Sequence, residues 1–308
     1  GGWSQRAVEF HPTINSILDT GPAAMPVKSP RGLMDMIWML RSGDYDMAIS
    51  LVRSPLMSLA VGLSGSPVRA GISSGWRGFG YTHKASTSPD DVRHESLIYL
   101  DVVKALDIDV EDCYANLPAP QEDQDFIADL LPKRGIDGPY LIVNPAGGSN
   151  PGMAMHSKRW PSEHFAQVAD TLAAEFGWQV ILLAGPDDSG IVNAVRSQMQ
   201  TPVTPFIGEL SFAQIAALTN KAALYIGNDT GLSHIAAASG APTVTIFRPS
   251  DPARYAPYTP RSLALWKPTQ LHSGGVQQTQ RTQWDWARDG IRPDEALLKI
   301  RDFLNKQA

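Results

Sequence analysis

Short apolar runs alternate along most of the chain with segments of helical periodicity. Runs of buried-strand type predict strands at residues 14–18, 45–52, 68–72, 140–143, 179–183, 203–207, 222–226 and 243–247. Apolar residues at helical spacing predict helices at residues 31–40, 56–63, 92–106, 125–131, 163–176, 189–199, 212–218 and 294–304. This alternation predicts an α/β fold with parallel sheets that helices cover on both faces.

One segment rich in proline and acidic residues interrupts the alternation. Residues 107–137 contain the run Leu117-Pro-Ala-Pro-Gln-Glu-Asp, and their composition predicts an interdomain linker. The linker divides the chain into two Rossmann-like domains with a cleft between them. The first comprises residues 1–137, including the linker, and the second comprises residues 138–308.

The composition places the chain among ordinary globular proteins. Of the 308 residues, 43% are hydrophobic and 19% are charged, and the net charge of −5 argues against a general nucleic-acid binder. The single cysteine, Cys113, excludes a disulfide framework within this sequence. His156 and His164 lack a third ligand at metal spacing, so we expect no metal site. No apolar run is long enough to predict a membrane-spanning helix.

A tight turn between two predicted strands carries the first candidate chemistry. Asp229 and Thr230 are turn and N-cap residue types, and Gly231 would let a ligand approach the backbone of the helix that follows. The N-terminus of a helix offers unpaired N–H groups and a partial positive charge, so it suits an anion, to which His234 would add a donor. The alternative is a capped helix with a surface histidine, and the spacing alone does not decide between them.

A second candidate is the glycine-rich loop at residues 144–161. Lys158 and Arg159 supply positive charge beside a predicted helix start. In a doubly wound sheet this loop can lie on the same edge as the turn at residues 228–234, so both could converge on one anion. The alternative is a flexible loop with a solvated basic pair. The loop lacks the Gly-Lys-Ser/Thr ending of a P-loop and the Gly-x-Gly-x-x-Gly spacing of a dinucleotide fingerprint.

Two motifs resemble a known family. The sequence Asn228-Asp-Thr-Gly-Leu-Ser-His-Ile-Ala-Ala-Ala-Ser-Gly-Ala-Pro-Thr-Val-Thr-Ile-Phe-Arg-Pro-Ser-Asp-Pro-Ala-Arg closely resembles the donor-site signature of the bacterial lipopolysaccharide heptosyltransferases, glycosyltransferase family 9. Lys158-Arg-Trp-Pro resembles the other hallmark of that family. Fainter similarity at Tyr45-Asp-Met-Ala-Ile-Ser, Val68-Arg-Ala-Gly-Ile and His94-Glu-Ser-Leu-Ile-Tyr-Leu extends the resemblance over nearly the whole chain.

The resemblance implies a GT-B fold and an inverting, metal-independent glycosyltransferase without a cofactor. The donor would be a nucleotide-diphosphate sugar, typically ADP-heptose, and the acceptor a lipid-linked saccharide of the lipopolysaccharide core. Such an acceptor implies a cytoplasmic enzyme that makes peripheral contact with the inner membrane. The first domain, with its aromatic loop at residues 73–89, would hold the acceptor, and the second would hold the donor. The sequence fixes neither the sugar, the nucleotide, the acceptor nor the oligomeric state.

Motif position also carries site roles onto this chain. Lys158 would have the catalytic role of neutralising the charge that develops on the leaving diphosphate. Glu209 would bind the ribose, and the amides of Thr230 and Gly231 would bind the diphosphate. The residues expected to bind the donor are Ser149, Lys158, Glu209, Asp229, Thr230, Gly231 and His234, with Gly148 as a further diphosphate contact.

The sequence departs from the family pattern at two points. The family's catalytic base is an aspartate in a Gly-Asp motif after the first strand of the N-terminal domain, and this sequence contains neither that strand nor that motif. Either the chain lacks its N-terminus, or this member has no base there. Arg248 stands where the family usually has glycine, and would add a phosphate contact or mark a different donor or acceptor.

Two other functions remain open on the sequence alone. A nucleotide-sugar epimerase of the same architecture would turn over the donor without an acceptor. A non-catalytic protein that binds sugar nucleotides, a degenerate transferase, would account for the absence of the base.

Overall fold

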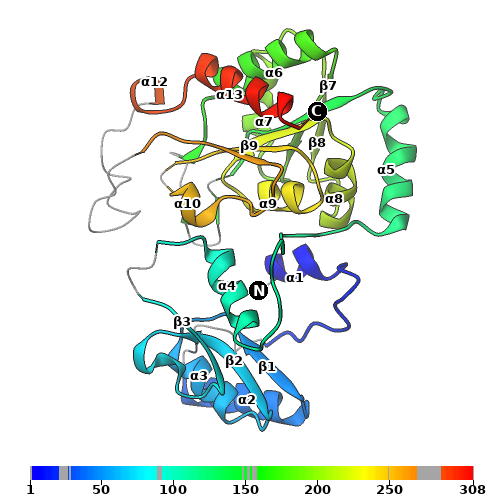
Figure 1. The fold of residues 1–308 in the computed structure, drawn as a ribbon. Coiled ribbons are helices and arrows are strands. Elements are labelled where there is room, and N and C mark those ends of the chain that lie inside the picture. Colours follow the sequence, from blue (N-terminus) through cyan, green and yellow to red (C-terminus); the bar gives the residue numbers. More distant parts are fainter. Residues whose placement is uncertain are drawn as a thin grey trace. The chain divides into compact units, whose positions relative to one another are not determined.

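The computed structural model divides the chain into two compact units (Figure 1). One comprises Ser16–Cys113 with Gly1–Gly2, and the other comprises Trp3–Asn15 with Tyr114–Ala308. The structure describes residues 2–20, 27, 29–88, 92–147, 149–150, 153–154, 158–248, 250–268 and 286–307.

The first unit contains a parallel three-stranded sheet in the order β1-β2-β3. One helix packs on this sheet through Ile98 and Val102, which meet Ala70, Ile72 and Ala85 of the strands. The elements are α2 (Pro30–Ser42), β1 (Met47–Ser50), α3 (Pro55–Gly62), β2 (Val68–Ser73), the 3₁₀ turn η2 (Gly75–Gly78), β3 (His83–Ser86) and α4 (Glu95–Lys104).

Serine–proline pairs start two of these helices. Ser29 Oγ accepts a hydrogen bond from the amide of Gly32 at 3.1 Å and so caps α2, which begins at the following proline. Ser54 caps α3 in the same way. A serine satisfies an amide that has no partner within the helix, and proline at the first position loses no hydrogen bond, so this dipeptide sets the start of each helix.

The second unit is built on a six-stranded parallel sheet in the order β11-β10-β9-β4-β7-β8. The predicted α/β class with parallel sheets is confirmed. The strands are β4 (Tyr140–Asn144), β7 (Gln179–Ala184), β8 (Val203–Ile207), β9 (Leu224–Asn228), β10 (Thr243–Ile246) and β11 (Ser262–Leu265). The helices are α1 (Gly2–Val8), α5 (Gln121–Lys133), α6 (Ser162–Phe176), α7 (Ser189–Arg196), α8 (Phe212–Asn220), α9 (Gly231–Ala238), α10 (Pro252–Tyr255), α12 (Trp286–Asp289) and α13 (Pro293–Asn305).

Two apolar cores cover the two faces of this sheet. Successive strand residues alternate between them, so Leu141 and Val143 face the core that α6, α7 and α13 complete, while Tyr140 and Ile142 face the core of α5, α8 and α9. A strand buried on both faces reads as a continuous apolar run, which is why the runs in the sequence located these strands.

The order of the strands places a switch point between β4 and β9. The chain runs outward from β4 through β7 to β8 and then crosses to β9 on the other side of β4. In an open α/β sheet the crevice for a ligand lies where the strand order reverses, outside the carboxyl ends of the strands. A ligand site is therefore expected at the segments that follow β4 and β9.

Several elements differ from their prediction; for example, β11 lies where no strand was predicted. The strand expected at residues 14–18 is absent: this segment is irregular, and Ile17 and Leu18 are exposed, so the apolar run has no sheet to join. In contrast, β3 lies within the loop expected at residues 73–89 and pairs with β2. Only Ala85 of its four residues is buried, so its apolar signal was too weak to predict a strand.

The segment expected as a linker contributes to the core of the second unit. Ile127 and Leu131 of α5 are buried there, and the amide of Leu117 donates to the carbonyl of Ala238 at 2.8 Å. The compact units therefore divide between Cys113 and Tyr114, earlier in the chain than the expected boundary at residue 137. None of the described helices is both long enough and apolar enough to cross a membrane.

Substituting Ser211 by alanine is expected to lower the free energy of unfolding by about 1 kcal/mol. Ser211 begins α8 in a capping box: its hydroxyl accepts from the amide of Gln214 at 3.1 Å, and the Gln214 side chain accepts from the Ser211 amide at 3.0 Å. Chemical denaturation measures the change. Ser197, whose hydroxyl donates to the carbonyl of Ala194, is the control, and Ser197→Ala should cost less than about 0.5 kcal/mol. Equal losses would contradict the role of the capping box.

Candidate functional site

The carboxyl ends of three neighbouring strands come together at the switch point. Asn144 of β4 lies opposite Gly227 of β9, and Asn228 lies opposite Ile246 of β10. The glycine-rich loop, the turn into α9 and the segment after β10 leave the sheet at these positions, so three segments far apart in the sequence form one edge. The convergence of the glycine-rich loop and the turn is what the sequence predicted.

Lys158 makes contacts to both of the other segments. Its Nζ lies 2.9 Å from Oδ2 of Asp229 and donates to Oγ of Ser250 at 3.1 Å. The Lys158 and Asp229 side chains keep only 14% and 11% of their exposure. Groups that are this far removed from water need a partner, and here each side chain supplies one to the other.

Asn228 ties the glycine-rich loop to the turn. Its side chain is fully buried; Nδ2 donates to the carbonyls of Pro145 and Ala146 at 2.9 and 3.1 Å, and Oδ1 accepts from the amide of Trp160 at 2.9 Å. One amide group thus binds the first and last parts of the loop that carries Lys158.

Two neighbours of Lys158 also fix that loop. The Trp160 ring is 1% exposed, and its Nε1 donates to the carbonyl of Ile291 at 2.9 Å. Arg159 donates to the carbonyl of Gly147 at 2.7 Å and lies 3.3 Å from the carboxylate of Asp188, which follows β7. Arg159 is therefore engaged within the protein, whereas the sequence left open a solvated basic pair.

The first turn of α9 has room for a ligand. Thr230 is the N-cap residue, with extended backbone, but its side chain makes no capping hydrogen bond. The amides of a first helical turn have no acceptor within the helix, so their donors remain available to an anion. A Cβ built on Gly231 would meet no atom within 4 Å, whereas one on Gly147 (φ 123°) would collide with the Thr230 methyl group. The backbone of the loop therefore passes directly against the turn.

Three more of the expected donor residues belong, by sequence, to the glycine-rich loop and to α9. His234 is exposed on α9. Ser149 belongs to the two-residue strand β5 (Ser149–Asn150), which pairs with β6 (Met153–Ala154). Gly148 lies outside the described residues. Their roles toward a donor stay predictions.

Glu209 follows β8 at the edge of the sheet, separated from β9 by β7 and β4. Arg134 Nη1 lies 2.8 Å from its Oε2, donates through Nη2 to the carbonyl of Pro205, and has its guanidinium 4.5 Å from the Phe206 ring centroid. The hydrogen bond from Arg134 lowers the pKa of Glu209, against a smaller opposing effect of burial. Arg134 thus favours the carboxylate form of Glu209. The expected binding of a ribose by Glu209 stays a prediction.

Arg248 follows β10 and is 4% exposed. Its guanidinium lies 6.0 Å from the Trp286 ring centroid. Burial lowers the pKa of Arg248 to about 10, and the charge of Asp289 opposes that effect. The position that departs from the family pattern therefore holds a buried cation beside the site.

Among the described residues, no group of three or more histidine, cysteine, aspartate or glutamate side chains could hold a metal ion. His164, one of the two histidines that the sequence singled out, packs edge-on against Trp160 with ring centroids 5.3 Å apart. Burial lowers the pKa of His164, so the neutral ring is favoured.

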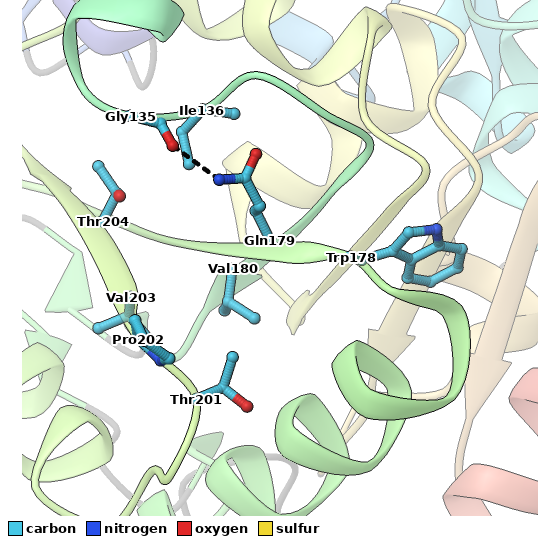
Figure 2. A pocket seen from close by; sticks show the side chains of 9 residues that line it. All are labelled: Gly135, Ile136, Trp178, Gln179, Val180, Thr201, Pro202, Val203 and Thr204. Atoms are coloured by element: carbon cyan, nitrogen blue, oxygen red, sulfur yellow. Dashed lines mark hydrogen bonds between the residues drawn. The ribbon is translucent and has the colours of Figure 1, made fainter.

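A hollow of about 260 Å³ at the amino ends of the strands is a poor candidate site (Figure 2). It lies at the amino ends of β7 and β8, away from the converging loops. Gln179, its most polar lining residue, donates to the carbonyl of Gly135 at 2.6 Å and accepts from the amides of Asp137 and Gly138. Its hydrogen-bonding capacity is therefore largely used within the protein.

Sequence reasoning missed three residues of the edge: Ser250, Asp188 and the bonding role of Asn228. The contacts of these residues join segments that are far apart in the sequence. The spacing of residues along the chain therefore could not predict them. Their position could have indicated two of them: Asn228 ends β9, and Asp188 lies shortly after β7. Ligand-binding residues of α/β sheets gather at the carboxyl ends of strands.

Comparison with known proteins assigns the family and the fold. The model of glycosyltransferase family 9 (heptosyltransferase) matches residues 34–284. Lipopolysaccharide heptosyltransferase 3 of Escherichia coli is 27% identical over 240 residues, which are 75% of this chain and 67% of that protein.

Two solved structures share the fold over almost the whole chain. The glycosyl transferase family 9 structure from Veillonella parvula matches with a TM-score of 0.77 at 24% identity, covering 98% of this chain and 86% of that one. The ADP-heptose lipopolysaccharide heptosyltransferase II of Escherichia coli matches with a TM-score of 0.66 at 20% identity, covering 99% and 88%. The expected GT-B fold is confirmed.

Pyrophosphate is expected to raise the melting temperature of the wild type, because a ligand that binds only the folded state stabilises it. Lys158→Met should lose most of this shift, since it removes the positive charge beside the first turn of α9. Differential scanning calorimetry measures both. Lys133→Met, at an exposed lysine in the last turn of α5, is the control and should keep the full shift. A full shift in Lys158→Met would contradict an anion site at this edge.

Proposed function

Because the chain belongs to glycosyltransferase family 9, the heptosyltransferase family, we propose that it transfers a heptose from ADP-heptose to a saccharide of the lipopolysaccharide core, with inversion at the anomeric carbon. The observation that carries the proposal is the ion pair of Lys158 with Asp229, which directly precedes the uncapped start of α9 at the switch point of the sheet. The names of the relatives support the choice of donor and acceptor, since they describe ADP-heptose and lipopolysaccharide heptosyltransferases.

The reaction needs positive charge beside the bond that breaks between the sugar and the diphosphate of the donor. The acceptor hydroxyl oxygen forms a bond to the anomeric carbon from the face opposite the diphosphate, the bond to the diphosphate oxygen breaks, and a base takes the hydroxyl proton. Negative charge then grows on the leaving ADP. Lys158 and the amides of Thr230 and Gly231 would stabilise that charge, as a metal ion does in other transferases. We therefore propose a metal-independent transfer.

Asp229 has a different part in this proposal. A carboxylate repels a diphosphate, but its Oδ2 holds Lys158 at 2.9 Å, and its Oδ1 accepts no hydrogen bond from any described residue. We propose that Asp229 orients Lys158 and accepts a hydrogen bond from a hydroxyl of the sugar. His234 and Ser149 would complete the contacts to the donor from the two segments on either side.

The nucleotide would extend from the turn across the ends of β4 and β7 toward Glu209. Nucleotides lie across the carboxyl ends of such sheets, on either side of the switch point. Arg134 contacts Oε2 of Glu209, so we propose that the other oxygen of the carboxylate accepts hydrogen bonds from the ribose hydroxyls. The acceptor, a lipid-linked saccharide, would be held by the first unit while the protein makes peripheral contact with the cytoplasmic face of the inner membrane.

Release of ADP from ADP-heptose tests the proposal, with a lipopolysaccharide core that lacks the accepted heptose as acceptor. We expect ADP release only when the acceptor is present. Turnover of the donor without an acceptor would indicate an epimerase or hydrolase instead. Tight binding of ADP-heptose without turnover in either case would indicate a non-catalytic binding protein.

Lys158→Met is expected to lower kcat by about 10²–10³-fold, the usual loss when one group that stabilises developing charge is removed. The KM for ADP-heptose should rise much less, since most contacts to the donor remain. Steady-state assays of ADP release measure both constants. Lys221→Met, at the exposed C-cap of α8, should leave kcat unchanged. A Lys158→Met enzyme with wild-type kcat would exclude the catalytic role.

Glu209→Gln is expected to weaken the binding of ADP but not of 2′,3′-dideoxy-ADP, because only ADP has hydroxyls for the carboxylate. Because Arg134 lowers the pKa of Glu209, the side chain should remain a carboxylate to a lower pH than an ordinary glutamate. Its contribution to folding is likewise present above the ordinary glutamate pKa of about 4.3 and is lost as the pH falls through the lower folded value.

Titration calorimetry with both nucleotides measures this selectivity. Glu175→Gln, which removes a carboxylate paired with Arg301 on an exposed surface, serves as the matched control. Equal weakening of both nucleotides by Glu209→Gln would exclude the ribose as the group that Glu209 binds.

A further inference from the structure

We propose that Asn228 is a positioning residue of the transfer reaction and acts through Lys158: its side-chain amide holds the Lys158 loop at a fixed place beside the first turn of α9. The inference rests on the proposed function and adds a residue to its machinery. Asn228 is 0% exposed, so a donor does not touch its side chain. Its effect on the reaction must therefore pass through the groups to which it bonds.

Those groups are the two ends of the loop. Nδ2 donates to the carbonyls of Pro145 and Ala146 at 2.9 and 3.1 Å, where the loop leaves β4. Oδ1 accepts from the amide of Trp160 at 2.9 Å, where the loop ends before α6. The partners also settle the orientation of the amide, since two carbonyls require a donor and one N–H requires an acceptor. A single planar group thereby closes the base of the loop.

Asn228 itself projects from a fixed backbone. It is the last residue of β9, paired in register with Ile246, and its carbonyl accepts from the Ser233 hydroxyl at 2.7 Å. The next residue, Asp229, donates its amide to the Ile246 carbonyl at 3.0 Å. The amide is therefore anchored to the same strand end and helix start that form the anion-binding turn.

Lys158 lies two residues before Trp160, the nearer end of this clamp. Trp160 is fixed on its other side by the bond from its ring to Ile291. With the clamp intact, Nζ of Lys158 reaches Asp229 and Ser250. A displacement of about 1 Å of a catalytic group can cost about 10²-fold in rate, so the clamp is a requirement for catalysis as well as for folding.

Few other side chains can make these bonds. Aspartate has nearly the same size and still accepts from Trp160, but it offers no donor to the two carbonyls and places a charge in a buried site. Glutamine has both kinds of group on a chain that is longer by one methylene. Alanine removes all three bonds.

A double-mutant cycle tests the proposal, because it separates an effect through Lys158 from a general loss of structure. Asn228→Asp, Lys158→Met and the double variant are assayed for kcat and for ADP binding. We expect Asn228→Asp to lower kcat about 10²-fold with a smaller change in KM. In the Lys158→Met background the same substitution should cost less than about threefold. Losses that multiply instead would overturn the proposal.

Asn228→Gln is the conservative variant, and we expect it to recover part of the activity that Asn228→Asp loses. It also keeps the test decisive if Asn228→Asp does not fold. Asn220→Asp is the matched control: its Nδ2 donates to the carbonyl of Ser239 at 2.6 Å beyond the other end of α9. This control should lower the melting temperature without lowering kcat. Equal loss of kcat in Asn220→Asp and Asn228→Asp would also overturn the proposal.

Failure of the proposed function is recognised separately. If the wild type binds ADP but transfers no sugar, the cycle is read from ADP affinity alone, and coupling between Asn228 and Lys158 still supports the positioning role. If the wild type is active and the cycle shows no coupling, the proposed function stands and the role of Asn228 is wrong.

Discussion

The arrangement of the site depends on one buried amide. Asn228 bonds both ends of a glycine-rich loop to the end of a central strand, so it converts a loop and a turn into one structural unit. Unsatisfied buried polar groups are costly, and here two carbonyls and one backbone amide would all lose a partner together. The loop is consequently bound at its base, while Gly147 passes against Thr230 at a distance that only glycine allows.

A second constraint is electrostatic. Lys158 and Asp229 neutralise each other in a site that is largely withdrawn from water, and Ser250 supplies a further acceptor from the segment after β10. A lysine held in this way is oriented before any donor arrives, and an oriented charge stabilises a developing anion better than one that must reorganise. Together with the amides of α9, this cation forms the site at which we propose that a diphosphate binds.

The sequence predicted the central features of the second unit for a clear physical reason. Strands buried on both faces are continuous apolar runs, so β4, β7 and β9 could be located from composition alone. The turn at Asp229 and the loop of Lys158 were identified by residue type and by resemblance, and the family is confirmed. Two predictions from short segments were wrong. Residues 14–18 are apolar but irregular. The strand β3 is mostly polar, but it forms because it pairs with β2.

The sequence by itself indicated which residues can carry the chemistry: a lysine in a glycine-rich loop, a helix start with a glycine in its first turn, and a carboxylate beside it. Tertiary structure alone decided which of these residues contact one another. The strand order puts β4 next to β9, so segments some eighty residues apart share an edge, and the contacts of Ser250, Asp188 and Asn228 follow from that order. Pairwise contacts between distant segments leave no periodicity in a single sequence, and they become visible only when the sheet has set the register of its strands.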